Sequence, residues 1–111
     1  MGFGLNPSPQ VSHVHQYSTI TSFNVGHTHR LSGTTGPTIR TRVSHIHLMQ
    51  GTTTFNDGHV HFYRNYTGPA IPTGPNTHVH RFFGVTTVNG RIPHVHRYSG
   101  VTAPARNDVY E

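Results

Sequence analysis

The chain has 111 residues, of which 8 are Lys or Arg (all of them Arg), 3 are Asp or Glu, 12 are His and none is Cys. The lack of cysteine excludes disulfide frameworks, thiol nucleophiles and cysteine-based zinc fingers, and so few carboxylates do not suffice for the paired acidic residues of glycosidases or aspartic proteases. Leu, Ile, Val and Phe together number only 25. We therefore expect a small core that needs help from a bound ion or a neighbouring subunit.

No apolar run approaches the roughly 18 residues of a membrane helix, so no membrane span is predicted. The first residues, Met1 to Asn6, lack the basic and apolar blocks of a signal peptide. The location of the protein is left unassigned, with an extracellular or cell-surface location kept open.

Histidine motifs divide the chain into three related units. Ser12-His13-Val14-His15 recurs as Ser44-His45-Ile46-His47 and as Thr77-His78-Val79-His80, and each unit contains a second His-x-His pair further along. We predict an N-terminal arm over residues 1–10, a single domain over 11–103 and a C-terminal tail over 104–111. The repeats within the domain are 11–42, 43–75 and 76–103. The arm and the tail are either loose or docked on a neighbouring subunit.

The spacing of the histidines predicts strands. Residues i and i+2 share one face of a strand but diverge on a helix, and the residue between the two histidines is β-branched in every pair. Asn-x-Gly and Asn-Gly between these segments are hairpin signals. The predicted fold is therefore all-β, with three antiparallel hairpins forming a sandwich, barrel or prism-like domain. The β-branched residues are expected to pack inward or against a second sheet.

The hairpin turns can be predicted in more detail. If Asn56-Asp57-Gly58 is a three-residue loop, Phe55 faces His59 across the ladder. In the third unit a two-residue Asn89-Gly90 turn would put His94 on the wrong face, since a one-residue slip inverts every side chain. A β-bulge is predicted to restore the face, and a loop that contains Arg91 is the alternative.

All 12 histidines are candidate metal ligands, because paired imidazoles on one strand face lie close enough to grip one ion. Two pairs would supply four nitrogens, which suits Zn²⁺ in a tetrahedron or Cu²⁺ and Ni²⁺ in tetragonal sites. Zinc or copper is the first expectation and nickel the second, and six pairs allow three four-histidine sites. The predicted ligands are His13, His15, His27, His29, His45, His47, His59, His61, His78, His80, His94 and His96.

Other functions were weighed against metal binding. The histidines could form a plain polar sheet face or a pH sensor. An enzyme is disfavoured because Asp57 is the only acidic residue inside the repeats, and its place in a turn explains it. Arg30, Arg81 and Arg97 follow histidine pairs near aromatic residues, but the modest net charge of +5 argues against nucleic-acid binding. The aromatics are expected to pack in the core or an interface.

The main alternative is a self-assembling structural subunit of an extracellular filament or coat. Few charges, many threonines and no lysine suit growth through sheet edges, because lysine is the commonest guard of an exposed edge. A homo-oligomer or polymer would also allow subunits to share metal ions, so this hypothesis is compatible with metal binding.

Several phrases of the chain resemble a known family. They are Thr54-Phe55-Asn56-Asp57-Gly58-His59-Val60-His61, Thr67-Gly68-Pro69-Ala70-Ile71-Pro72 and Gly84-Val85-Thr86-Thr87-Val88-Asn89-Gly90-Arg91-Ile92-Pro93-His94-Val95-His96. They are similar to the YmaF family of small bacterial His-x-His repeat proteins, over roughly residues 11–103. The resemblance implies a bacterial source and a repeat architecture, and it assigns no substrate.

Overall fold

The computed structural model describes residues 10–109, which form strands and turns with no helix among them. The all-β prediction is confirmed, and no helix in the described part of the chain could cross a membrane. The strands are β1 (Gln16–Ile20), β2 (Arg30–Thr34), β3 (Ile39–Arg40), β4 (His45–Ile46), β5 (Leu48–Thr52), β6 (Phe62–Tyr66), β7 (Ala70–Gly74), β8 (Thr77–Val85), β9 (Arg97–Val101) and β10 (Ala105–Arg106).

Three antiparallel hairpins form the body of the molecule. They are the pairs β1–β2, β5–β6 and β8–β9, each with five residues in register on either side. The short strands β3 and β4 pair with each other, and β7 and β10 both pair with the first half of β8. None of the sheets closes into a barrel.

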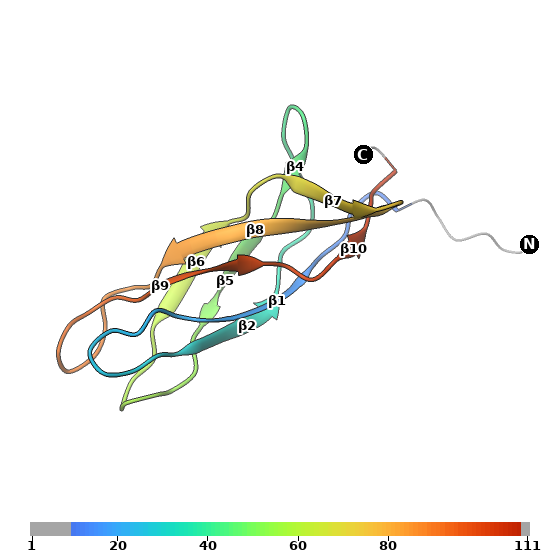
Figure 1. Cartoon of the computed structure of the whole chain (residues 1–111). Helices are drawn as coiled ribbons and strands as arrows, with labels where there is room; N and C mark the ends of the chain where they lie inside the picture. Colours follow the sequence, from blue (N-terminus) through green and yellow to red (C-terminus); the bar gives the residue numbers. More distant parts are fainter. Residues whose placement is uncertain (1–9, 110–111) are drawn as a thin grey trace, which may run out of the picture.

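The hairpins run along a common direction and give an elongated molecule (Figure 1). Their three connecting loops gather at one end, and the described chain termini lie toward the other. Backbone hydrogen bonds tie neighbouring hairpins together near the loops: the Ser22, Thr54 and Thr87 amides donate to the carbonyls of Arg97, Arg30 and Phe62 at 2.8–2.9 Å. Each hairpin therefore contacts both others.

The first two loops are tighter than predicted. Asn24 pairs with His27 and Asn56 with His59, so only two residues form each turn. All four turn residues have positive φ: 50° at Val25, 51° at Asp57, 80° at Gly26 and 81° at Gly58. Such turns match the twist of a hairpin. The prediction of a three-residue loop was wrong, and Phe55 is 71% exposed instead of facing His59.

The third loop is longer. Asn89 pairs with His94, which leaves residues 90–93 in the loop. The loop that contains Arg91 therefore brings His94 to the correct face, and the predicted bulge was wrong. The two extra residues are absorbed at the solvent-exposed tip, where they disturb no strand pairing.

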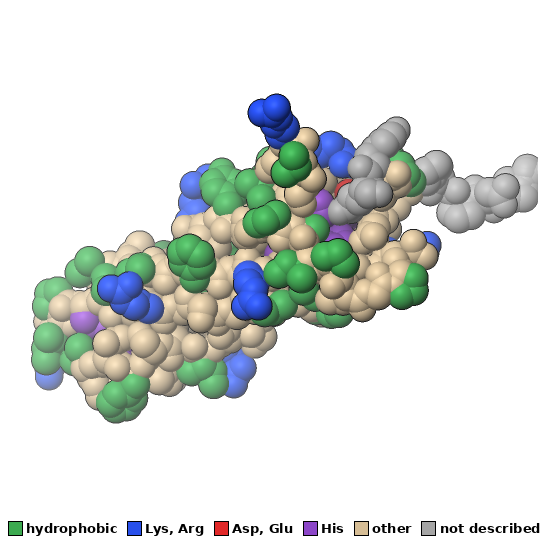
Figure 2. All heavy atoms as spheres, turned by 45° about the horizontal axis from the view of Figure 1, so that its top comes forward, with side chains coloured by type: hydrophobic (Ala, Val, Ile, Leu, Met, Phe, Trp, Pro, Cys, Tyr) green, Lys and Arg blue, Asp and Glu red, His purple; other side chains and the backbone are tan. Residues whose placement is uncertain are grey.

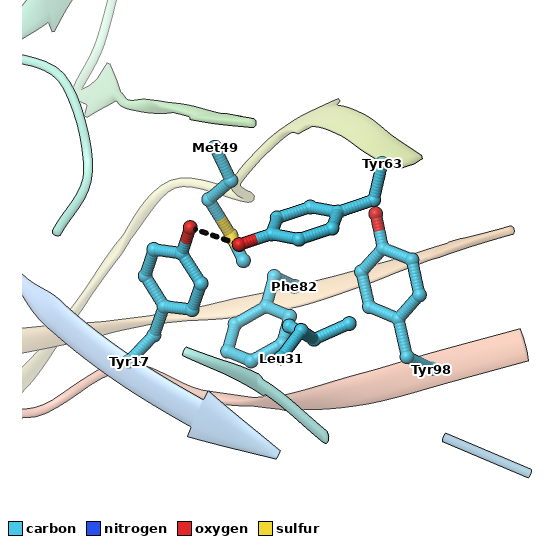
Figure 3. Packing of buried hydrophobic residues seen from close by; sticks show 6 residues of the cluster. All are labelled: Tyr17, Leu31, Met49, Tyr63, Phe82 and Tyr98. Atoms are coloured by element: carbon cyan, nitrogen blue, oxygen red, sulfur yellow. Dashed lines mark hydrogen bonds between the residues drawn. The ribbon is translucent and has the colours of Figure 1, made fainter. Parts of the chain in front are cut away.

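On the inward face of each hairpin strand, a pair of histidines is followed by one buried apolar residue. Two positions after the second histidine of each pair lies a buried residue, and together these form the core: Tyr17, Leu31, Met49, Tyr63, Phe82 and Tyr98. Figure 3 shows these side chains converging, with the Tyr17 and Tyr63 hydroxyls 2.8 Å apart. The β-branched residues between the histidines were expected to pack inward or against a second sheet, but only Val79 is buried; Val14 is 47% exposed and the other four are half-buried. The histidines themselves occupy the inward positions, so period-2 alternation turns their neighbours outward.

Glycines lie opposite the aromatic core residues. Gly33 pairs with Tyr17 and Gly51 with Tyr63 across their hairpins. A Cβ atom on Gly51 would lie 2.7 Å from the Tyr63 hydroxyl, so only glycine lets the ring lie across the neighbouring strand. The same arrangement occurs at Gly84, opposite Tyr98, and at Gly100, opposite Phe82.

Candidate metal centres

The twelve histidines form two separate clusters of six. The loop-side site, next to the three hairpin loops, contains His27, His29, His59, His61, His94 and His96. The cap-side site, named for the C-terminal segment that contacts it, contains His13, His15, His45, His47, His78 and His80. In each cluster one ligand atom per histidine lies within 4.8 Å of all the others. Every predicted ligand is therefore in a cluster, and the histidines form two groups of six instead of the three groups of four that six pairs allow. Three hairpins meet at each level, so three pairs converge where two were expected.

The imidazole rings of each cluster are arranged as an octahedron. Every ring lies edge-to-face with four of the other five, at centroid distances of 4.5–5.1 Å in the cap-side site and 4.7–5.0 Å in the loop-side site. The fifth ring is the one across the centre. Four neighbours and one opposite partner define the vertices of an octahedron, in which the two members of a His-x-His pair are adjacent.

The Nε2 atoms point toward the centre of each cluster. Adjacent Nε2 atoms are 3.0–3.3 Å apart in the loop-side site and 2.8–3.1 Å apart in the cap-side site. An octahedron with such edges has vertices about 2.2 Å from its centre, close to the metal–imidazole distances of proteins. Histidine atoms reach the surface at both ends of the molecule (Figure 2).

The other ring nitrogen of the second histidine in each pair is held by a backbone carbonyl. We call these six residues the inner histidines: His15, His29, His47, His61, His80 and His96. Their Nδ1–H groups donate to the carbonyls of Ala103, Thr54, Gly36, Thr87, Gly68 and Ser22, at 2.8–2.9 Å. These carbonyls all lie far along the chain from the histidine that they bind, so each bond also joins separate segments.

The first histidines of the pairs, which we call outer, are held differently at the two sites. In the loop-side site, His27, His59 and His94 donate from Nδ1 to carbonyls two residues earlier in their own loops. In the cap-side site, His13 donates to the Asp108 carboxylate at 2.7 Å, and the Nδ1 of His78 lies 2.7 Å from the Asn107 side-chain oxygen.

These bonds decide the tautomer. A carbonyl oxygen only accepts, so a neutral imidazole whose Nδ1 faces one carries its proton there and presents an unprotonated Nε2. All six histidines of the loop-side site meet this condition, and so do the three inner histidines of the cap-side site. At least nine Nε2 lone pairs therefore point at cluster centres. Such bonds orient metal-binding histidines in known metal sites.

Six buried threonines support the inner histidines. The His61 amide donates to the Thr53 hydroxyl at 3.0 Å, and the Thr53 amide donates to the His61 carbonyl at 2.9 Å. The same pair of bonds occurs for Thr21, Thr35, Thr67, Thr86 and Thr102 with their histidines. These residues were missed in the sequence, although a signal was available: a threonine follows every inner histidine by six positions.

Burial keeps the inner histidines neutral. Removal from water lowers the pKa of His15, His47 and His61 to about 4 and that of His80 to about 3, against the opposing effect of their carbonyl hydrogen bonds. Neighbouring imidazoles lower these pKa values further, because they repel a second positive charge. Neutral imidazole is the form that binds metal.

Asp108 is the acidic residue next to a cluster centre that the sequence did not single out. Its side chain is fully buried, and Thr38 donates to it at 2.8 Å. Burial by itself would raise the pKa of this carboxyl, but hydrogen bonds from His13 and Thr38 outweigh burial and lower it. Asp108 is therefore an ionised carboxylate behind one cap-side ligand. Asp57 is the turn residue that was predicted, and its exposed carboxylate lies 3.1 Å from the Nδ1 of His27, a loop-side ligand.

The structure also bears on the aromatic residues considered for nucleic-acid binding. Tyr17, Phe82 and Tyr98 are buried in the core, so their rings are not available to stack on bases. Their predicted role in packing is confirmed. Phe83 points outward and is 80% exposed.

Comparison with known proteins supports the resemblance seen in the sequence. No curated protein and no solved structure matches the chain. Residues 10–103 match the family YmaF, described as spore germination protein GerY/YamF. Since this match covers most of the 111 residues, including both histidine clusters, the chain belongs to the YmaF family.

Proposed function

We propose that the protein binds two transition-metal ions, one at the centre of each histidine cluster. The convergence of unprotonated Nε2 atoms carries this proposal. In the loop-side site six lone pairs face one another with adjacent nitrogens 3.0–3.3 Å apart. Because the Nδ1 atoms hold the protons, these nitrogens have no hydrogen to share and repel one another. A central cation turns that repulsion into coordination.

Six-coordinate geometry favours some ions over others. Imidazole suits iron, nickel, copper and zinc, but zinc prefers four ligands in a tetrahedron and Cu²⁺ prefers tetragonal sites. The expectation of zinc or copper depended on four ligands for each ion. With six equivalent nitrogens we propose a divalent ion that accepts a regular octahedron, Fe²⁺ or Ni²⁺.

The proposed role of the ions is structural. Each ion would join all three hairpins, and the apolar core cluster of the described chain consists of six side chains. Metal binding would then supply folding free energy that the small core lacks. Six protein ligands also leave no coordination position for a substrate or water, which argues against catalysis at the ion.

Metal content tests this proposal. Protein purified without an affinity tag is expected to carry two ions per chain by native mass spectrometry, with elemental analysis identifying the metal. His15→Ala removes a cap-side ligand and His29→Ala a loop-side ligand, so each variant is expected to lose one ion. Val14→Thr is the matched control, because Val14 lies between two ligands but points into solvent.

Two measurements on chelator-stripped protein, metal uptake and unfolding temperature, can refute the proposal. If chelator-stripped protein takes up neither Fe²⁺, Ni²⁺, Co²⁺ nor Zn²⁺, and none of them raises its unfolding temperature, the metal proposal is wrong.

Self-assembly is a second candidate. Large apolar side chains lie on the surface, including Phe83 at 80%, Phe23 at 72% and Phe55 at 71% exposure. Exposed aromatic side chains of this size offer apolar surface that another subunit could cover. The family is described as a spore germination protein. We therefore propose that the metal-loaded form of this protein acts in spore germination. Light scattering with and without chelator separates the candidates: assemblies that persist without metal would favour a purely structural role.

A further inference from the structure

We infer that the two metal sites are kinetically different: the loop-side site exchanges its ion with solution and the cap-side site retains its ion. This inference rests on the proposed binding of two ions. It follows from how the outer ligands are held, because an ion leaves only after some of its ligands swing away.

The outer ligands of the loop-side site depend mainly on contacts within their own loops. His27 has one further contact, because its Nδ1 lies 3.1 Å from the exposed carboxylate of Asp57 in the second loop. His27, His59 and His94 each follow a loop tip and use the carbonyl two residues earlier as Nδ1 acceptor. Each of the three is paired only through an isolated bridge to an asparagine across its turn. A loop can therefore open with its ligand while the hairpin ladder stays intact. Local opening of this kind costs much less free energy than breaking a sheet.

A cavity gives access to the same ligands. It has a volume of about 510 Å³ and lies among all three hairpin loops, where His59 and His94 form part of its wall and Val25 represents the first loop. Asp57, Arg91 and Ile92 also line it. Small ligands occupy cavities of this size, so a chelating molecule can reach the outer ligands of the loop-side site.

Two of the three outer ligands of the cap-side site lie in strands, whereas His13 precedes β1. His45 lies in β4 and pairs with Arg40, while His78 lies in β8 between Pro72 of β7 and Ala105 of β10. The backbone of either histidine can move away from the ion only if strand pairing breaks.

Gln10 and the C-terminal segment 105–109 lie over this site, and we call them the C-terminal cap. The Gln10 side chain donates to the Arg106 carbonyl at 2.7 Å, and the Val109 amide donates back to the Gln10 carbonyl at 2.7 Å. From the cap, Asp108 binds His13, and Asn107 contacts His78. The cap therefore holds two outer ligands through contacts between the two ends of the described chain.

Release of Ni²⁺ tests the inference. Protein loaded with two Ni²⁺ ions is mixed with excess EDTA, and native mass spectrometry follows the two-, one- and zero-nickel forms. We expect a one-nickel form to accumulate, because the first ion leaves at least about tenfold faster than the second. His15→Ala, which keeps the loop-side site, is expected to lose its ion in the fast phase, and His29→Ala, which keeps the cap-side site, in the slow phase.

Variants of the cap identify the slow phase without removing a ligand. Asp108→Asn and Gln10→Ala are expected to accelerate the slow phase and to leave the fast phase unchanged. Loss of both ions in one phase, or acceleration of the fast phase by the cap variants, would overturn the inference. Failure to bind any Ni²⁺ would instead count against the proposed function.

Discussion

X-ray absorption of the nickel-loaded protein gives the most direct measure of the proposed coordination. The perturbation is the addition of two equivalents of Ni²⁺ to chelator-stripped protein. In a regular octahedron the distance between adjacent ligands is the metal–ligand distance multiplied by √2. Adjacent Nε2 atoms lie 3.0–3.3 Å apart at the loop-side site and 2.8–3.1 Å apart at the cap-side site.

These separations predict a nickel–nitrogen distance of about 2.2 Å, somewhat longer than the zinc–nitrogen distance of about 2.0–2.1 Å in four-coordinate sites. The absorption spectrum is expected to show six nitrogen neighbours and the outer-shell scattering of imidazole rings. Cobalt offers a second measurement, because its weak visible absorption distinguishes six-coordinate from four-coordinate Co²⁺.

A set of four nitrogens, or a mixed set with two or more water oxygens, would refute the octahedral argument. Either result would mean that some rings leave the cluster when the ion enters.

Three further predictions concern the protein without metal. The unfolded chain binds more protons below pH 6.5 than the folded chain, since burial lowers the pKa of three inner histidines to about 4. The free energy of unfolding, measured by urea titration, should therefore fall as the pH drops from 6.5 to 4, and a flat profile would contradict this. Thr53→Val removes the hydroxyl that accepts a hydrogen bond from the His61 amide, so it should lower the free energy of unfolding by about 1–3 kcal/mol. The control Thr52→Val, at an exposed position, should change the free energy of unfolding very little, and equal losses would argue against the role of Thr53. Met49→Ala empties a position that is 0% exposed and should lower the free energy of unfolding by about 2–5 kcal/mol, with a loss well under 1 kcal/mol showing that the core does not depend on this side chain.

The sequence was sufficient for local features. A His-x-His pair with a β-branched centre predicts an extended segment whose imidazoles share one face, and all twelve histidines lie inward as that geometry requires. The Asn-x-Gly signals likewise placed the hairpin loops. These predictions succeeded because they depend only on residues two to four positions apart.

The predicted three-residue turn was wrong because the sequence did not determine the register of the hairpin. Placing Phe55 opposite His59 required the register of the hairpin, which shifts by one residue according to whether the turn has two or three members. Positive φ at Asp57 and Gly58 selects the two-residue turn. The same sequence is compatible with a two-residue and a three-residue turn, so the sequence alone did not distinguish them.

Pairing of histidines across the molecule lay beyond the sequence. That His13 shares a cluster with His45 and His78 of the other two units follows from three hairpins meeting side by side at each end. The number of ligands per site changes from four to six for the same reason. Asp108 likewise reaches His13 only because the C-terminal segment folds back across 95 residues.

By itself, therefore, the sequence determined which residues could bind metal and which way each would point from its strand, because alternation along an extended backbone is a local property. Only the tertiary structure decided how many would meet, in which geometry and with what support behind them. Those quantities depend on how separate hairpins pack around a common centre, and packing is decided by contacts between residues far apart in the chain.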